Sequence, residues 1–282
     1  LKTDHKLMLS GKKIFPLLRF SQDDASQRTA ADLHKDSHIK VFLPSLAYLY
    51  VSHSINGVLL RPANNARGWD WDLATSYQQI SDTVYEFKLR QEVVFQDGTP
   101  FNADAVVLNM KYFKKQPYLY TKIDQVFSHC EKVDDYTVRM HLKEKYSQFI
   151  NDLIWVVFYT KEYLDKFGWN GKSTAPNLAE PGLYGLGPYI LKQGYVEGDR
   201  HTPEVVLEAN PLYWNKKYPK VKKVTIYTEM GPDKALKAVT GSEGQLDITP
   251  IPYSAKVETI LSPYSNYDFR ISWNNFCSRI LD

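Results

Sequence analysis

Residues 84–110, VYEFKLRQEVVFQDGTPFNADAVVLNM, carry the pattern that decides the fold class of this chain. Apolar and charged residues alternate from Tyr85 to Arg90, and this two-residue period predicts a strand with one buried face. A second short strand is expected over Val93 to Phe95. Asp97 and Gly98 then supply a turn, because these residue types tolerate the backbone conformations that turns require.

A capped helix is predicted directly after this turn. Asn102 stands where an N-cap acceptor is needed, and Asp104 in the first turn is favoured by the helix dipole. Apolar residues then recur on one helical face, at Val106, Val107, Met110 and Phe113. Strand, turn and amphipathic helix together predict a mixed α+β unit.

Similar patterns predict further elements along the chain. Alternation or continuous apolar runs favour strands over 38–43, 137–142, 205–209 and 222–228. Residues 46–60 are expected to be helical or rich in helix, and residues 148–157 to form a buried helix or strand. Pro232 is typical of a first helical position and predicts a helix over 232–238. The Gly- and Pro-rich residues 168–187 predict a long connection.

Composition narrows the class of protein. With 282 residues and 43% apolar residues, the chain is long enough to build a substantial core. The net charge is only +3, so no basic surface for nucleic acid is expected. Aromatic residues make up 14% of the chain, an excess that favours either core packing or a solute cleft.

Sequence motifs of common enzyme classes are missing. The chain contains no H-E-x-x-H, G-x-S-x-G or Walker A pattern, and its seven His residues are scattered. His129-Cys130 is the one adjacent His/Cys pair and falls short of a zinc site, while His141 is predicted on the outer face of a strand. Cys130 and Cys277 are expected to be free thiols. No catalytic residue, metal site or cofactor is predicted.

Six segments in a fixed order resemble one known family. They are WDLATSY (71–77), YEFKLR with FQDGTPFNADAV (85–90 and 95–106), VDDYTV (133–138), GLGPY (185–189), NPLYW (210–214) and LDI (246–248). In this order they are similar to the extracellular solute-binding proteins that deliver peptides, nickel and related solutes to ABC importers.

This resemblance implies an α/β (mixed α+β) fold: the first lobe of a periplasmic-binding-protein-like structure, with an inserted subdomain and only the start of a second lobe. Residues 38–60 and 182–247 would form the main mixed sheet, residues 61–181 the inserted subdomain, and residues 248–282 the hinge crossing and the start of the second lobe. Residues 1–37 are expected to be an extension of unknown role. Since family members are commonly much longer, a fragment lacking most of the second lobe is expected.

The implied function is binding. The chain would be the substrate-binding component of an ABC importer, capturing a peptide or similar small solute in an interlobe cleft and presenting it to the permease. A nickel- or metal-chelate-binding member of the same family, or the ligand-sensing module of a regulator, are the alternatives. A monomer in the periplasm or outside the cell is expected, with the anchor type open, although residues 1–13 show no signal-peptide core.

The resemblance also implies binding and hinge residues. The candidates for ligand contact are Tyr118, Tyr120, Trp155, Tyr159, Tyr184, Trp273 and Asn274. Core filling is the alternative role for each of these rings. The hinge is expected at Gly185, Gly187, Asp247 and Thr249. Residues 155–158 contain no Arg where nickel-type members offer one to an anionic chelate, which weakens the nickel alternative.

Overall fold

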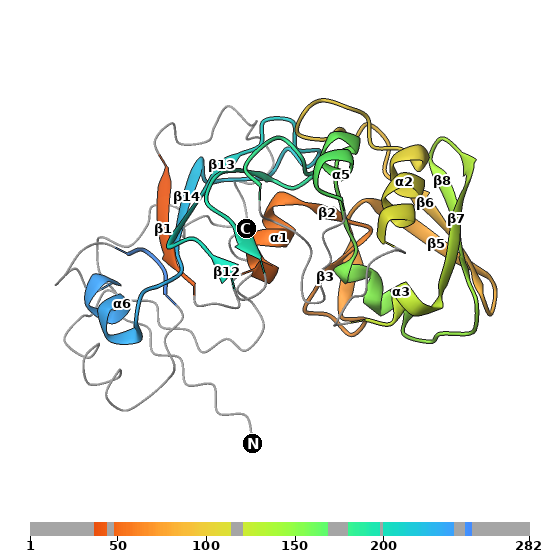
Figure 1. Ribbon diagram of the computed structural model, residues 1–282, viewed down its shortest axis with the longest axis horizontal. Coiled ribbons are helices and arrows are strands. Elements are labelled where there is room, and N and C mark those ends of the chain that lie inside the picture. The colour runs from red at the N-terminus through yellow and green to blue at the C-terminus, as the bar shows by residue number, and fades with distance from the viewer. Residues whose placement is uncertain are drawn as a thin grey trace, which may run out of the picture.

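Two four-stranded sheets, one toward each end of the molecule, organise the chain in the computed structural model (Figure 1). The structure describes residues 37–43, 48–113, 121–168, 180–197, 200–239 and 246–249. Helix and strand are mixed throughout these ranges, as the sequence predicts.

The first sheet is mixed and has the strand order β1-β14-β13-β10. It contains β1 (His38–Phe42), β14 (Lys223–Tyr227), β13 (Glu204–Ala209) and β10 (Tyr189–Gln193). The pair β1 and β14 is parallel, whereas the other two pairs are antiparallel. Its buried side chains include Val41, Leu207 and Ile226, and they pack with Val51 and Ile55 of helix α1 (Tyr48–Ile55).

The second sheet is antiparallel throughout, in the order β5-β6-β8-β7. Its strands are β5 (Ala74–Ser81), β6 (Val84–Leu89), β8 (Thr137–Leu142) and β7 (Phe127–Asp134). Phe87, Val138 and Met140 are fully buried on one face. Helix α2 (Ala103–Phe113) lies against that side of the sheet (Figure 1). The other face carries polar side chains such as Glu86, Arg139 and His141.

The helix that follows the Asp-Gly turn is capped as predicted. The Asn102 side-chain oxygen accepts a hydrogen bond from the Ala105 backbone N–H at 3.1 Å. Within the helix, Asn109 is fully buried, and its amide bonds both the backbone N–H and the carbonyl of Tyr159 at 2.9 Å. One buried amide therefore fixes the segment after residue 156 against α2.

Short strand pairs lie outside these two sheets. Strand β2 pairs with β9, β3 with β4, and β11 with β12. The remaining bounds are β2 Gly57–Val58, β3 Leu60–Pro62, β4 Trp69–Trp71, α3 Ile123–Val126, α4 Phe149–Asp152, the 3-10 helix η5 Leu153–Trp155, β9 Val157–Phe158, α5 Lys161–Phe167, β11 Val196–Glu197, β12 Arg200–His201 and α6 Pro232–Val239.

Most predicted elements are confirmed, including the strands β1, β6, β8, β13 and β14 and the helix that begins at Pro232. The prediction of a second short strand over Val93 to Phe95 is wrong. Val94 makes only an isolated bridge to Pro100, because the turn between them reverses the chain within a few residues. The Phe95 backbone N–H bonds the Thr99 carbonyl at 2.8 Å and closes this turn.

Two other predictions were too coarse. The helical segment expected over 46–60 ends at Ile55, after which the chain enters β2 and β3. A Cβ on Gly57 would lie 2.6 Å from the Leu73 Cδ1 atom and 2.9 Å from the Leu186 Cβ atom, so a larger residue would require these side chains to shift. Residues 148–157 are not one helix or strand but α4, η5 and the start of β9 in succession.

Candidate functional site

The chain leaves the first sheet along the edge of β1, where hinge residues were predicted. Val41 forms a parallel bridge to Ile248, and the Phe42 N–H bonds the Ile248 carbonyl at 3.0 Å. The Asp247 carboxylate accepts the Lys40 backbone N–H at 2.7 Å, and the Asp247 N–H bonds the Lys40 carbonyl at 2.8 Å. Asp247 and the isolated bridge at Ile248 therefore hold residues 247–248 against the edge of β1.

The two predicted hinge glycines lie in a close-packed junction. A Cβ on Gly185 would stand 2.1 Å from the Ile55 carbonyl oxygen, and one on Gly187 would stand 2.5 Å from the Ile55 carbonyl carbon. The Gly187 N–H also donates to the Ile55 carbonyl at 2.7 Å. These glycines allow residues 185–187 to touch the end of α1.

Gln96 holds this junction together, a role that the sequence patterns did not predict. Its amide nitrogen donates to the carbonyls of Ile55 at 3.1 Å and Tyr189 at 2.7 Å. Its amide oxygen accepts the Gly185 N–H at 3.1 Å. Only 4% of Gln96 is exposed, so all three bonds form away from bulk water.

Asn210 makes the second buried connection at the same junction. Its amide donates to the Gly187 carbonyl at 2.8 Å, and its backbone N–H donates to the Pro188 carbonyl at 2.8 Å. Gln96, GLGPY and Asn210 belong to three of the segments from which the family resemblance was inferred. These segments therefore meet in space and build the fold.

Arg90 ties a fourth segment to the same region. Its Nε donates to the Asp72 carbonyl at 2.8 Å, and its guanidinium lies 3.8 Å from the centre of the Trp214 ring. The Asp72 side chain is buried and accepts the Val58 N–H at 3.3 Å. Burial raises the pKa of this carboxyl, although Val58, Arg61 and Arg90 oppose the rise.

Two predicted ligand residues, Tyr159 and Tyr184, come together beside α5. The Tyr159 ring stacks on Tyr163 with 4.3 Å between ring centres, and Tyr184 lies 5.2 Å from the same ring. Tyr159 is only 2% exposed, whereas Tyr184 is half-buried. Of these two rings, Tyr184 is therefore the one that a solute could reach without opening the core.

Trp155 lies at the end of η5, half-buried against the core that surrounds α2. The preceding carbonyl, that of Ile154, accepts a hydrogen bond from His53 Nε2 of α1 at 2.9 Å. Helix α1 thus touches both the Trp155 segment and the Gly185 junction. The other predicted contact residues, Tyr118, Tyr120, Trp273 and Asn274, lie outside the described residues.

A groove of about 540 Å³ lies elsewhere, beside β5. Arg67, Trp69, Tyr77 and Tyr85 are among its lining residues, and none of the three described ligand candidates, Trp155, Tyr159 and Tyr184, lines it. Within the described ranges, one group of three potential metal ligands occurs, His129, Glu131 and His141 on the second sheet.

None of the helices in the described ranges has the length and apolar character needed to cross a membrane.

The structure combines a mixed sheet with an antiparallel sheet, and Ile248 returns to the edge of β1. This arrangement is that of a lobe of a periplasmic-type solute-binding protein. The family model for bacterial extracellular solute-binding proteins, family 5 (middle), matches residues 71–274, and the chain belongs to that family. Family members are periplasmic or extracellular proteins that bind peptide or metal-chelate ligands and work with ABC permeases.

Relatives of known function share this segment. The glutathione-binding protein GsiB of Escherichia coli K12 is 30% identical over 211 residues, which cover 71% of this chain and 37% of GsiB. The chain thus spans well under half the length of the curated relatives it matches. GsiB of Shigella boydii is likewise 30% identical, over 64% of this chain and 34% of its own length.

Solved structures share the fold at low identity. NikA from Brucella suis, in complex with Fe(III)-EDTA, is 22% identical with a TM-score of 0.60, over 74% of this chain and 43% of NikA. The oligopeptide-binding protein AppA from Bacillus subtilis, in complex with a nonapeptide, is 20% identical with a TM-score of 0.62, over 79% of this chain and 45% of AppA.

Proposed function

We propose that this chain is the substrate-binding component of an ABC importer and that it captures a peptide or a similar small solute. The observation that carries the proposal is the match of residues 71–274 to family 5, whose segments here build the junction around Gln96. The chain is proposed to bind without catalysis, as a monomer, in the periplasm or outside the cell.

The solute would lie between this lobe and a second lobe. Tyr184 and Trp155 would contribute ring area from the described part, with Tyr159 behind them in the core. Tyrosine suits such a role because it offers a flat apolar ring together with a hydroxyl that can bond a peptide group. Tyr118, Tyr120, Trp273 and Asn274 are proposed as the remaining contacts.

Closure of the two lobes would bury the solute and create the form that the permease recognises. Asp247 and Thr249 are proposed as the hinge, because they flank Ile248, which forms an isolated bridge at the edge of β1. Gly185 and Gly187 would support that motion from the rigid side, through their contact with α1. We also infer that the mixed sheet is the main part of the lobe and the antiparallel sheet its inserted subdomain.

A peptide-like solute is favoured over a metal chelate. GsiB is named for glutathione, a short peptide, and AppA was solved with a nonapeptide. Residues 155–158, WVVF, contain no Arg that could offer a guanidinium to an anionic chelate. Val156, Val157 and Phe158 are buried in the core, so Trp155 is the residue of this segment that a solute could contact.

Isothermal titration tests this proposal on the protein purified from its host. Glutathione, a tripeptide mixture and a nickel–histidine chelate would be titrated separately. The proposal expects saturable one-to-one binding of a peptide ligand, and a loss of about tenfold or more in affinity for Tyr184→Ala. Tyr136→Ala is the matched control, because Tyr136 is also partly buried against this core but lies in the turn between β7 and β8; this variant should bind like the parent.

Binding of the chelate alone, with no peptide response, would overturn the peptide assignment. Equal affinity of Tyr184→Ala and the parent would remove Tyr184 from the site. Circular dichroism of each variant confirms that a change in affinity does not reflect unfolding.

A further inference from the structure

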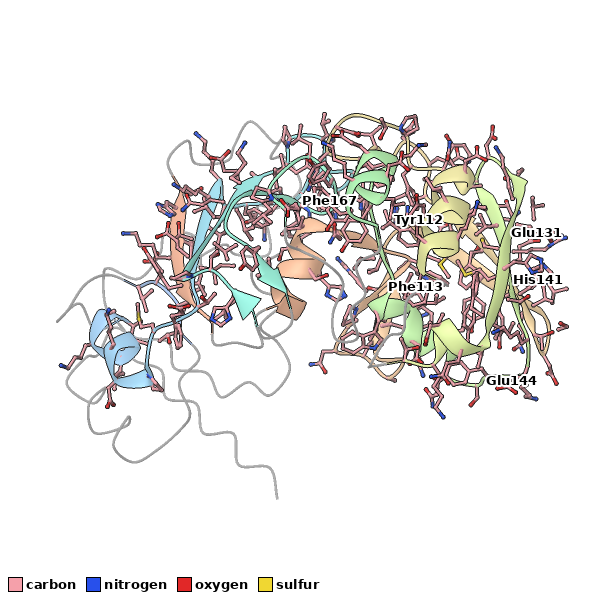
Figure 2. All side chains as sticks on the ribbon, in the orientation of Figure 1. Tyr112, Phe113, Glu131, His141, Glu144 and Phe167 are labelled. Atoms are coloured by element: carbon pink, nitrogen blue, oxygen red, sulfur yellow. The ribbon has the colours of Figure 1, made fainter. Side chains whose placement is uncertain are left out.

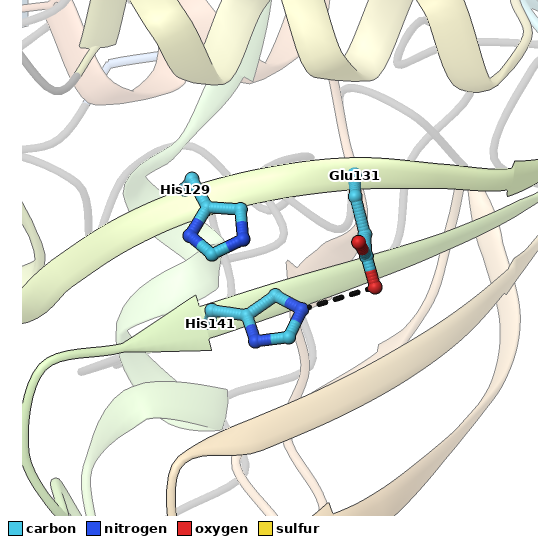
Figure 3. A group of neighbouring side chains, drawn as sticks. All are labelled: His129, Glu131 and His141. Atoms are coloured by element: carbon cyan, nitrogen blue, oxygen red, sulfur yellow. Dashed lines mark hydrogen bonds and ion pairs between the residues drawn. The ribbon is translucent and has the colours of Figure 1, made fainter.

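The polar face of the second sheet brings two imidazoles and a carboxylate together (Figure 3). His129 and Glu131 are two residues apart on β7, so both point to the same face of the sheet. His141 of β8 is the direct cross-strand partner of His129. One potential ligand atom from each residue lies within 4.8 Å of the others.

The three side chains already interact with one another. His141 Nε2 lies 3.1 Å from Glu131 Oε1, the contact drawn as a dashed line in Figure 3. The rings of His129 and His141 stack with 4.2 Å between their centres and 5° between their planes. The strand pairing thus fixes their Cβ atoms side by side, while the rings themselves remain near the surface.

We propose that His129, Glu131 and His141 form a binding site for a divalent transition-metal ion such as Zn²⁺ or Ni²⁺. Two imidazoles and one carboxylate, with water in the remaining position, are a donor set that these ions prefer. Bonds of about 2.0–2.2 Å would place the ligand atoms about 3–3.5 Å apart. The rings must therefore rotate out of their stack and close by about an ångström.

Exposure allows this rotation. The His141 side chain is 25% exposed and the Glu131 side chain 45% exposed, and His129 is also exposed. No apolar side chain of the core has to move, because the core lies on the opposite face of the sheet, under α2. Metal binding would then cross-link the edge strand β7 to β8.

The positive charge of Arg139 opposes a cation at this site. Its guanidinium lies 3.9 Å from Glu131 Oε1, on the same face of the sheet. The stronger contact of Arg139 is with Glu86, at 2.8 Å from its Nε atom. Glu131 is therefore available to a metal, but at an affinity reduced by the charge of Arg139.

The site is separate from the described part of the proposed solute site. Glu131 and His141 lie at the end of the molecule that is farthest from β1 (Figure 2). Of the residues proposed to contact the solute, Trp155 lies in η5, Tyr159 between β9 and α5, and Tyr184 in the connection before β10. Metal binding here is thus a property additional to solute binding.

Titration calorimetry with zinc chloride on the full chain tests the proposal. Loss of even an outer partner of a metal ligand commonly weakens binding about 10–100-fold, so His129→Gln and His141→Gln should each weaken it at least about tenfold. His201→Gln is the matched control, because His201 lies 3.9 Å from Glu229 but belongs to no such cluster in the described residues. It should bind zinc like the parent.

Arg139→Gln provides a variant that should improve binding, which misfolding would not produce. Its affinity for zinc should rise several-fold. Nitrogen NMR of the imidazoles adds a direct readout, in which the ring signals of His129 and His141 should shift at one equivalent of zinc. Shifts confined to other histidines, or a His129→Gln/His141→Gln double variant that binds zinc like the parent, would overturn the proposal.

Discussion

At the scale of single residues, buried side-chain amides connect segments of this lobe that are distant in sequence. Gln96 makes three hydrogen bonds that join residues 55, 185 and 189, which are far apart in sequence. An apolar side chain such as Leu cannot form these bonds and would leave the buried backbone groups without partners. Such groups are expensive because they lose water and gain nothing in return.

We therefore expect Gln96→Leu to destabilise the protein by about 2–4 kcal/mol. The free energy of unfolding from urea titrations, followed by tryptophan fluorescence, measures this effect. Gln78→Leu is the control, because Gln78 is exposed on β5 and should change stability by less than about 0.5 kcal/mol. Similar stabilities for the two variants would contradict the structural role of Gln96.

Gly185 makes a second prediction at this scale. Gly185→Ala would place a methyl group 2.1 Å from the Ile55 carbonyl oxygen, a contact that only movement of the backbone can relieve. Overpacking of this kind costs about 1–3 kcal/mol. Gly231→Ala is the matched control, because no heavy atom lies within 4 Å of that position. Urea titration of both variants measures the free energy of unfolding. Equal stabilities for Gly185→Ala and Gly231→Ala would show that residue 185 is not closely packed against Ile55.

The chemistry of Cys130 is also set by its surroundings. Burial raises the pKa of this thiol to about 12, with a smaller contribution from Glu131. The thiolate is the reactive form, so at pH 8 its population should be on the order of a thousandfold below that of an ordinary thiol. Alkylation by iodoacetamide should therefore be slow in the native protein and should accelerate with pH up to about pH 11.

Peptide mass spectrometry after timed alkylation measures this rate, with the urea-unfolded chain as the control. The same shift affects stability. Between the unfolded thiol pKa of about 8.5 and the folded value, the folded state holds a proton that the unfolded state releases, so stability falls as pH rises through that window. Rapid labelling of native Cys130 at pH 8 would refute the effect of burial.

At the scale of elements, the sequence pattern was sufficient where a local rule governs the structure. The alternation in β6 and the cap and apolar face of α2 depend on neighbours in sequence, so both were predicted correctly. The strand expected at Val93 to Phe95 failed because the tight turn leaves room for only one bridge, at Val94. Helix α1 ends at Ile55, and Gly57 then lies close to Leu73 and Leu186, a tertiary contact that no local pattern shows.

The candidate sites were less predictable than the fold, for the same reason. Tyr159 and Tyr184 were proposed from family position, but only the packing around Tyr163 shows which ring is buried. His129 and His141 are 12 positions apart, and their pairing follows from the register of β7 and β8 after a bulge near His129. That register is set by tertiary packing and could not be read from the spacing of the residues.

The cap of α2 gives the prediction for this scale. Asn102→Ala removes the bond to the Ala105 N–H, and loss of such a cap costs about 1 kcal/mol. Asn64→Ala, in the exposed loop between β3 and β4, is the control and should leave stability unchanged. The midpoint of urea unfolding should fall for Asn102→Ala only; equal midpoints would mean that the cap contributes nothing to this helix.

At the scale of the whole molecule, one lobe is assembled from segments that cross between two sheets. Residues 38–42 and 246–248 meet at the edge of the mixed sheet, although the entire second sheet lies between them in sequence. Asp247 fastens this crossing through the Lys40 backbone N–H. The proposed function uses this geometry, because residues 247–249 are the proposed hinge between this lobe and a second one.

Native mass spectrometry of the protein as purified from its host tests the central proposal most directly, because it detects a bound solute without prior choice of ligand. We predict one additional mass per chain that is released on denaturation and fragments as a peptide. A preparation that carries a non-peptide solute, or that fails to take up peptides supplied in excess while remaining folded, would contradict the assignment of this lobe to peptide capture.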